Sequence, residues 1–72
     1  MRNRIRLDTA KDVEEFVNIA GTVTSDVMIT DDKFTVNGKS LLGVMYCKAE
    51  FDNLWVECSE DIYHKIEKFI IE

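Results

Sequence analysis

The sequence contains one histidine and two cysteines, the residue types most typical of proton transfer near neutral pH and of nucleophilic or zinc sites. The single histidine, His64, lies between Tyr63 and Lys65, and we expect it to face solvent on a helix. The two cysteines, Cys47 and Cys58, sit within apolar patterns and lack the spacing of metal ligands. We therefore predict two buried free thiols and no metal or cofactor, with a disulfide or a zinc site as the alternative.

Ser40 stands directly before a run of large apolar residues, within the stretch VNGKSLLGVM that covers residues 36–45. A serine at the start of a helix accepts a hydrogen bond from a backbone N–H group and contributes about 1 kcal/mol to the helix. The same position suits a phosphoryl group, because the helix dipole and the amide donors stabilise negative charge. Ser40 is thus both an expected helix cap and a candidate site of regulatory phosphorylation.

The apolar run after Ser40 cannot be buried by a single helix face. If Val44 and Cys47 point inward, the other large side chains of the run must lie partly outside. The predicted exposed patch surrounds Gly43 and consists of Leu41, Leu42, Met45 and Tyr46. Exposed apolar patches mark partner surfaces, and flexible methionine suits a surface that meets several partners. The alternatives are ordinary exposed hydrophobic residues or a surface for self-association.

Periodic patterns predict the elements in the first half of the chain. Residues 3–7 alternate basic and apolar side chains, which is typical of a strand with one buried face. A helix is expected to follow, opened by a capping box of Thr9 and Asp12 and ended by Gly21 in a left-handed conformation. Residues 26–30 and 33–36 have the alternation of two strands joined by a turn, and are predicted to form a hairpin.

The second half contains two further expected helices and one strand. A short helix is predicted over about residues 40–47, after an Asn-Gly turn, and a strand over residues 53–58. Ser59 is a plausible cap for a terminal helix, whose apolar stripe consists of Ile62, Ile66, Phe69 and Ile70.

The resulting order, β-α-β-β-α-β-α, predicts an α+β fold of two layers. Two strand-helix-strand units with right-handed crossovers build a four-stranded antiparallel sheet with three helices on one face. The other face of the sheet stays open. On that face we expect Arg4, Arg6, Met28 and Trp55, with an arginine covering the indole ring of Trp55.

Length and charge restrict the possible functions. The 72 residues suffice for one domain, which we place over residues 1–72. The net charge of −5 argues against nucleic acid as a partner, since phosphate backbones are bound by excess Lys and Arg. The amino-terminal residues contain no apolar stretch typical of a signal peptide, so we expect a cytoplasmic location without membrane contact.

The element order and residues 36–45 together resemble the histidine-containing phosphocarrier proteins, HPr, of the bacterial sugar phosphotransferase system. The resemblance covers nearly the whole chain and is most specific at NGKSLLGVM, residues 37–45, which is similar to the family's segment around its regulatory serine. Further matches upstream, at consistent spacing, are Phe16-Val17, Ala20 and Ser25-Asp26-Val27. The resemblance implies an HPr-like open-faced sandwich and, at Ser40, phosphorylation by an HPr kinase/phosphorylase.

The same resemblance exposes a missing residue. The family carries phosphate on a histidine at the start of the first helix, followed by a small residue, an arginine and a proline. Aligned through Phe16-Val17, this motif falls on Thr9, Ala10, Lys11 and Asp12. A threonine hydroxyl is a far poorer nucleophile than imidazole, and Lys11 lacks the bidentate fork of arginine. Asp12, with Asp8 and Glu15, also places negative charge where a phosphate would bind.

Three functions remain open from the sequence. The first is a regulatory or binding module without carrier chemistry, which uses Ser40 and the apolar patch to bind a transcriptional or metabolic regulator. The second is a divergent phosphocarrier, which the replacement by Thr9 disfavours. The third is a structural or oligomeric remnant of the family whose apolar patch is covered by another copy.

Overall fold

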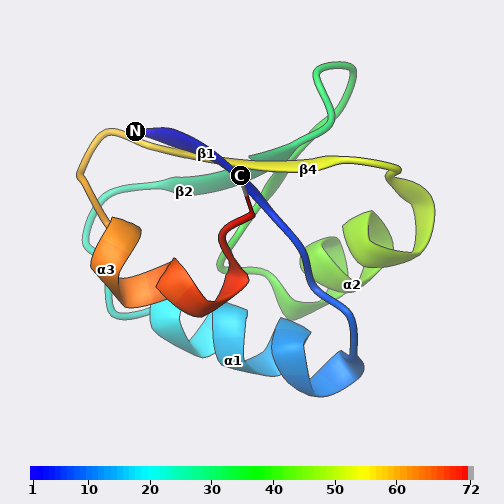
Figure 1. Cartoon of the computed structure of the whole chain (residues 1–72), viewed down its shortest axis with the longest axis horizontal. Coiled ribbons are helices and arrows are strands. Elements are labelled where there is room, and N and C mark those ends of the chain that lie inside the picture. Colours follow the sequence, from blue (N-terminus) through cyan, green and yellow to red (C-terminus); the bar gives the residue numbers. More distant parts are fainter. Residues whose placement is uncertain (72) are drawn as a thin grey trace.

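The computed structural model describes residues 1–71, which form a single sheet covered by helices on one side (Figure 1). The strands are β1 (Arg2–Ile5), β2 (Val27–Thr30), β3 (Thr35–Asn37) and β4 (Leu54–Cys58). The helices are α1 (Ala10–Ala20), α2 (Leu41–Glu50) and α3 (Tyr63–Ile66), and a 3₁₀ turn, η1 (Glu67–Phe69), follows α3. The predicted order of elements is confirmed.

The sheet is antiparallel throughout, with the strand order β1-β4-β2-β3. Strand β4 therefore lies in the interior of the sheet, between β1 and β2, although it is the last strand in the sequence. In Figure 1 the helices all lie below the sheet, and its upper face is uncovered. The fold is thus the predicted α+β open-faced sandwich.

The core lies between the sheet and the helices, because each element directs alternate or periodic apolar side chains toward that layer. The largest side chains with no exposed surface come from both layers, and they are Phe16, Ile29, Ile62, Ile66, Val13, Val27, Val44, Val56 and Cys47. Phe16 of α1 also meets Phe69 of η1 edge to face, with ring centroids 5.9 Å apart. These contacts fix α1 and α2 against the sheet and so position their amino ends.

The open face is held together by ion pairs around one tryptophan. The Arg2 guanidinium lies 4.7 Å from the centroid of the Trp55 ring. It also forms ion pairs with Asp32, at 2.6 Å, and with Glu57. The predicted cover of Trp55 by an arginine is confirmed, and the arginine is Arg2, since β1 begins one residue before the predicted strand. Arg6 follows the end of β1 and pairs with Asp8, so its predicted place within the open-faced strand is wrong.

The end of α1 and the terminal segment differ from the prediction. Gly21 has a φ of −63° and is right-handed, because the chain continues in tight turns in which Thr22 and Val23 donate to the carbonyls of Ile19 and Ala20. Ser59 does not cap α3, whose N-cap residue is Ile62. The terminal helix is also shorter than predicted, because Ile70 leaves it to form a β-bridge with Ile5.

The longest helix of the described chain has 11 residues, and none of its helices has the length and apolar character needed to span a membrane.

Candidate functional site

Ser40 caps the amino end of α2, as predicted. Its extended backbone precedes the helix, and its Oγ accepts a hydrogen bond from the Gly43 N–H at 3.1 Å. The Ser40 carbonyl in turn accepts from the Val44 N–H at 2.9 Å. The side chain is partly exposed, and no acidic residue lies in the first turn of α2. The helix terminus at Ser40 is therefore free of carboxylates from its own helix.

The turn before Ser40 is built by Asn37 and Gly38. The Asn37 side-chain oxygen accepts from the Lys39 N–H at 2.9 Å, and its carbonyl accepts from the Ser40 N–H at 3.0 Å. The buried Gly38 donates its N–H to the Val27 carbonyl at 2.6 Å. A Cβ at this position would lie 2.8 Å from that same carbonyl oxygen, so only glycine allows the close approach. The Asn-Gly pair thus sets the direction in which α2 begins.

Lys39 does not direct its charge toward Ser40, although it is the adjacent residue. Its ammonium donates to the Val23 carbonyl at 2.6 Å, in the segment that follows α1. The sequence offers no signal for this contact, because the two residues are far apart along the chain. A negative charge on Ser40 would consequently not be neutralised by Lys39 in this arrangement.

The four apolar side chains predicted to lie outside on α2 are exposed. Leu42 is the most accessible at 83%, while Leu41, Met45 and Tyr46 are between 40% and 55% exposed. Val44 and Cys47 point inward and are fully buried, as predicted. The Tyr46 ring also meets Phe51, the C-cap residue of α2, edge to face at 6.1 Å. We call Leu41, Leu42, Met45 and Tyr46 the α2 patch.

Thr9 is engaged in capping α1, and the predicted capping box is confirmed. Its Oγ1 accepts from the Asp12 N–H at 3.1 Å. The Asp12 carboxylate in return accepts from the N–H groups of Asp8, at 2.9 Å, and Thr9, at 3.2 Å. The backbone donors in front of α1 are therefore occupied by a carboxylate that belongs to the protein itself, whereas the amino end of α2 has no such group.

The other charged residues near the start of α1 are directed elsewhere. Asp8 lies 3.3 Å from the Arg6 guanidinium, and Glu15 pairs with Lys68 of η1. The expectation that Glu15 adds to the negative charge at the helix start is therefore wrong. Lys11 is exposed at the beginning of α1. Helices α1 and α2 pack against each other below the sheet, so Thr9, Lys11 and Ser40 belong to neighbouring elements (Figure 1).

His64 and the cysteines are placed as predicted. The His64 side chain is 92% exposed, and its Nδ1 lies 3.4 Å from Glu67. Both cysteines are buried free thiols, and burial raises the pKa of Cys47 to about 11. No group of three or more His, Cys, Asp or Glu within residues 1–71 is arranged to hold a metal ion.

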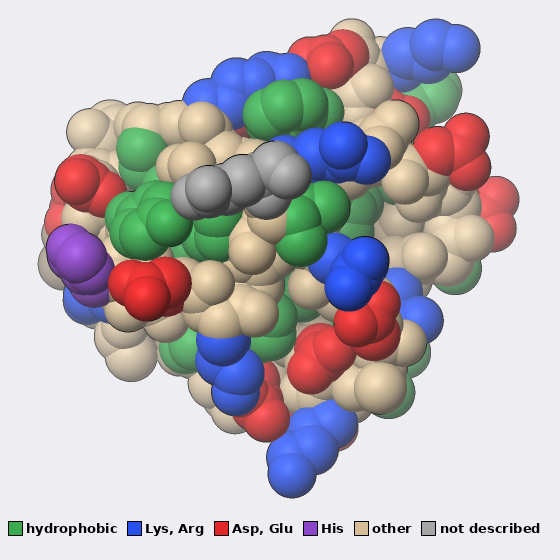
Figure 2. Space-filling model, in the orientation of Figure 1, with side chains coloured by type: hydrophobic (Ala, Val, Ile, Leu, Met, Phe, Trp, Pro, Cys, Tyr) green, Lys and Arg blue, Asp and Glu red, His purple; other side chains and the backbone are tan. Residues whose placement is uncertain are grey.

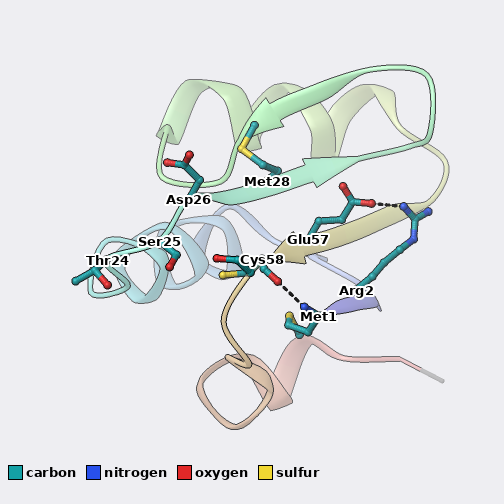
Figure 3. Close-up of a pocket in the computed structure, with 9 residues that line it drawn as sticks. Met1, Arg2, Thr24, Ser25, Asp26, Met28, Glu57 and Cys58 are labelled. Carbon is teal, nitrogen blue, oxygen red and sulfur yellow. Dashed lines mark hydrogen bonds and ion pairs between the residues drawn. The ribbon is translucent and has the colours of Figure 1, made fainter.

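A cavity of about 680 Å³ lies where β1, β4 and the segment before β2 meet (Figure 3). Several of its polar groups are paired, with one another or with residues nearby. Arg2 is bound by Glu57 and Asp32, and the Met1 amino group donates to the Cys58 carbonyl. Ser25 donates its N–H to Glu60 at 3.1 Å, and hydrogen bonds from Ser25 lower the pKa of that carboxyl group. Arg2 and the amino group of Met1 are thus engaged, whereas the Asp26 carboxylate of the lining has no hydrogen bond or ion pair with a described residue.

The face of the molecule shown in Figure 2 carries no large patch of side chains of one charge. Basic and acidic side chains are interspersed there, with hydrophobic side chains exposed between them (Figure 2). The charged side chains therefore give no sign of a nucleic-acid surface on that face.

Comparison with known proteins identifies the fold. No protein-family model matches the sequence, and none of the curated proteins gives a significant sequence match. Among solved structures, the chain is similar to the crystal structure of HPr-C-His from Thermoanaerobacter tengcongensis, with a TM-score of 0.67 and 22% sequence identity. The similarity covers 94% of this chain and 81% of that one. The chain therefore has an HPr-like fold.

Proposed function

We propose that this protein is a cytoplasmic regulatory or binding module related to the phosphotransferase system. It acts through Ser40 and the α2 patch, binds protein partners, and does not carry phosphate on an imidazole. The observation that carries the proposal is the exposure of the four α2 patch residues beside a serine at a helix terminus without acidic residues. By resemblance, the partners are an HPr kinase/phosphorylase and a transcriptional or metabolic regulator.

Phosphorylation at Ser40 is compatible with the folded state. Phosphate oxygens on Oγ are acceptors for the Gly43 N–H that now binds the hydroxyl at 3.1 Å, and the helix dipole favours the added charge. Because the Lys39 ammonium is bound to Val23, the charge of about −2 that a phosphate brings stays uncompensated beside Leu41. The modification therefore changes what the α2 patch binds and leaves α2 in place.

Carrier chemistry at Thr9 is disfavoured by the local geometry. The hydroxyl is engaged in capping, and the Asp12 carboxylate occupies the donors that would face a phosphoryl group. A second carboxylate, Asp8, lies next to Thr9 in the sequence. The negative charges of Asp8 and Asp12 repel a phosphate dianion that approaches Thr9.

The test is incubation with an HPr kinase and ATP, followed by intact-mass measurement. We expect the wild-type chain to gain one phosphoryl group and Ser40→Ala to gain none. Ser59→Ala is the matched control, because it removes another exposed hydroxyl and should still be phosphorylated. No mass gain on the wild-type chain contradicts the regulatory role of Ser40.

The α2 patch is tested in the same assay. Leu42→Ser should raise the KM of the kinase for this protein, whereas Phe34→Ser should not, although Phe34 is also 64% exposed. Sedimentation velocity over a range of concentrations separates partner binding from self-association. A dimer that Leu42→Ser abolishes would assign the α2 patch to contact with a second copy.

A further inference from the structure

A second cavity, of about 210 Å³, lies at the carboxyl end of α2, at a distance along that helix from Ser40. Three cationic side chains line it, from three different parts of the chain. Arg4 belongs to β1, Arg6 follows β1, and Lys48 lies in the last turn of α2. The chain as a whole has a net charge of −5 and contains nine basic residues. Three of these nine line one small cavity, so the lining is positively charged although the chain is negatively charged.

The polar groups of this cavity are incompletely paired within residues 1–71. Lys48 is partly buried, and its side-chain ammonium has no hydrogen bond or ion pair with any described residue. Asn53 accepts a hydrogen bond from Arg4 through its Oδ1, which leaves its Nδ2 hydrogens available as donors. Among the described residues, the Arg6 guanidinium is paired only with Asp8, an exposed partner at 3.3 Å. Exposed pairs of this kind are weak and exchange readily for another anion.

The walls of the cavity also limit what it can bind. Its apolar residues include Leu7, Phe51 and Ile71, and Asp52 is the one acidic residue among the described residues that line it. Guanidinium and ammonium groups with an amide donor recognise phosphate oxygens through charge-assisted hydrogen bonds. The small volume accommodates a compact ligand and excludes a nucleotide or a peptide segment.

We propose that this cavity binds a small phosphate monoester, with its phosphate between Arg4, Arg6 and Lys48 and with Asn53 as a further donor. The site is distinct from Ser40 and does not depend on phosphorylation there. It adjoins the α2 patch, because Phe51 lines the cavity and meets Tyr46 of the α2 patch at 6.1 Å.

The test uses glycerol 3-phosphate as the probe, with ¹⁵N NMR titration of the full chain at low ionic strength. We expect saturable shifts at residues 4–7, 48 and 51–54, with a dissociation constant in the millimolar range, as is usual for a ligand of about ten heavy atoms. Glycerol should give no such shifts. An absence of saturation, or shifts centred on the amino end of α2 or on the cavity of Figure 3, overturns the proposal.

Charge variants distinguish this cavity from a general effect of net charge. Lys48→Gln should weaken binding about fivefold, the upper end of the effect expected from one solvent-exposed charge–charge contact. Lys33→Gln makes the same change in net charge on the hairpin, outside the cavity, and should leave the affinity unchanged. Asp52→Asn should strengthen binding, since it removes a carboxylate that lines the cavity. Equal losses in the two lysine variants, or no gain in Asp52→Asn, contradict the assignment.

Discussion

The Oγ atom of Ser40 accepts a hydrogen bond from the Gly43 N–H at 3.1 Å, so the first turn of α2 is closed by the atom that a kinase would modify. Capping and phosphorylation therefore involve the same oxygen. Their consequences for stability can be separated by substitution, because alanine removes the acceptor whereas aspartate retains it.

We expect Ser40→Ala to lower the free energy of unfolding by about 1 kcal/mol, since the Gly43 N–H loses its partner. Ser40→Asp should change it by less than about 0.5 kcal/mol, because aspartate is as good an N-cap residue as serine. Urea denaturation followed by circular dichroism measures both values. If both variants lose the same stability, the cap does not account for the role of Ser40 in the fold.

Restoring a histidine at position 9 should not restore carrier activity. In Thr9→His the Asp12 carboxylate still faces the Asp8 and Thr9 backbone donors, at 2.9 and 3.2 Å in the present structure, and repels a phosphoryl group. We expect no phosphorylation of this variant from phosphoenolpyruvate through the general phosphotransferase enzyme. A bacterial HPr serves as the positive control, and acid-labile phosphate on Thr9→His would show that the missing imidazole is the sole defect.

Gly38→Ala should destabilise the fold by about 1–3 kcal/mol, because the added methyl group meets the backbone of β2. Its Cβ would lie 2.8 Å from the Val27 carbonyl oxygen and 3.0 Å from Val27 Cγ1. Gly21→Ala is the control, since a Cβ there has ordinary contacts of 3.4 Å, and we expect little change or a small gain. Thermal unfolding of the two variants gives the comparison.

The burial of Cys47 predicts a loss of stability at alkaline pH. Its pKa is raised from about 9.0 to about 11 in the folded chain, so between these values the unfolded state releases a proton that the folded state keeps. Stability should therefore fall as the pH rises through this range, by about 1.4 kcal/mol per pH unit from this thiol alone. Urea titrations at pH 8 and pH 10.5 should show a smaller fall for Cys47→Ala. If stability falls equally with pH in the wild-type chain and in Cys47→Ala, then folding does not raise the pKa of the Cys47 thiol.

The features predicted correctly from sequence are those fixed by local patterns. The alternation that includes Ile5, the capping box of Thr9 and Asp12, and the inward positions Val44 and Cys47 each follow from periods or pairs within a few residues. The Asp31 turn is of the same kind, since its side chain accepts from the N–H groups of Lys33 and Phe34. These donors also lower the pKa of Asp31.

The structural features that the sequence does not predict depend on contacts between distant segments, or on residues that do not continue a pattern of buried apolar side chains. Helix α2 continues to Glu50, beyond the predicted end at Cys47, because Lys48, Ala49 and Glu50 favour helix but extend no buried stripe. Ile70 was assigned to a helix by its spacing, whereas pairing with Ile5 holds it in a bridge. The cavity at Lys48 was not foreseen, because its lining comes from three segments that only the fold brings together.

The bridge between Ile5 and Ile70 restricts where a further strand could pair with the edge of this sheet. Residues 69–71 cover the outer side of β1, where Arg6 donates to the Phe69 carbonyl at 2.8 Å and Ile71 donates to the Arg4 carbonyl at 2.9 Å. Within residues 1–71 this covers the edge of the sheet at residues 4–6, and the other edge is β3, a strand of only three residues. Residues 69–71 thus hinder a foreign strand from pairing with that part of β1, and an open-faced sheet need not be an aggregation-prone one.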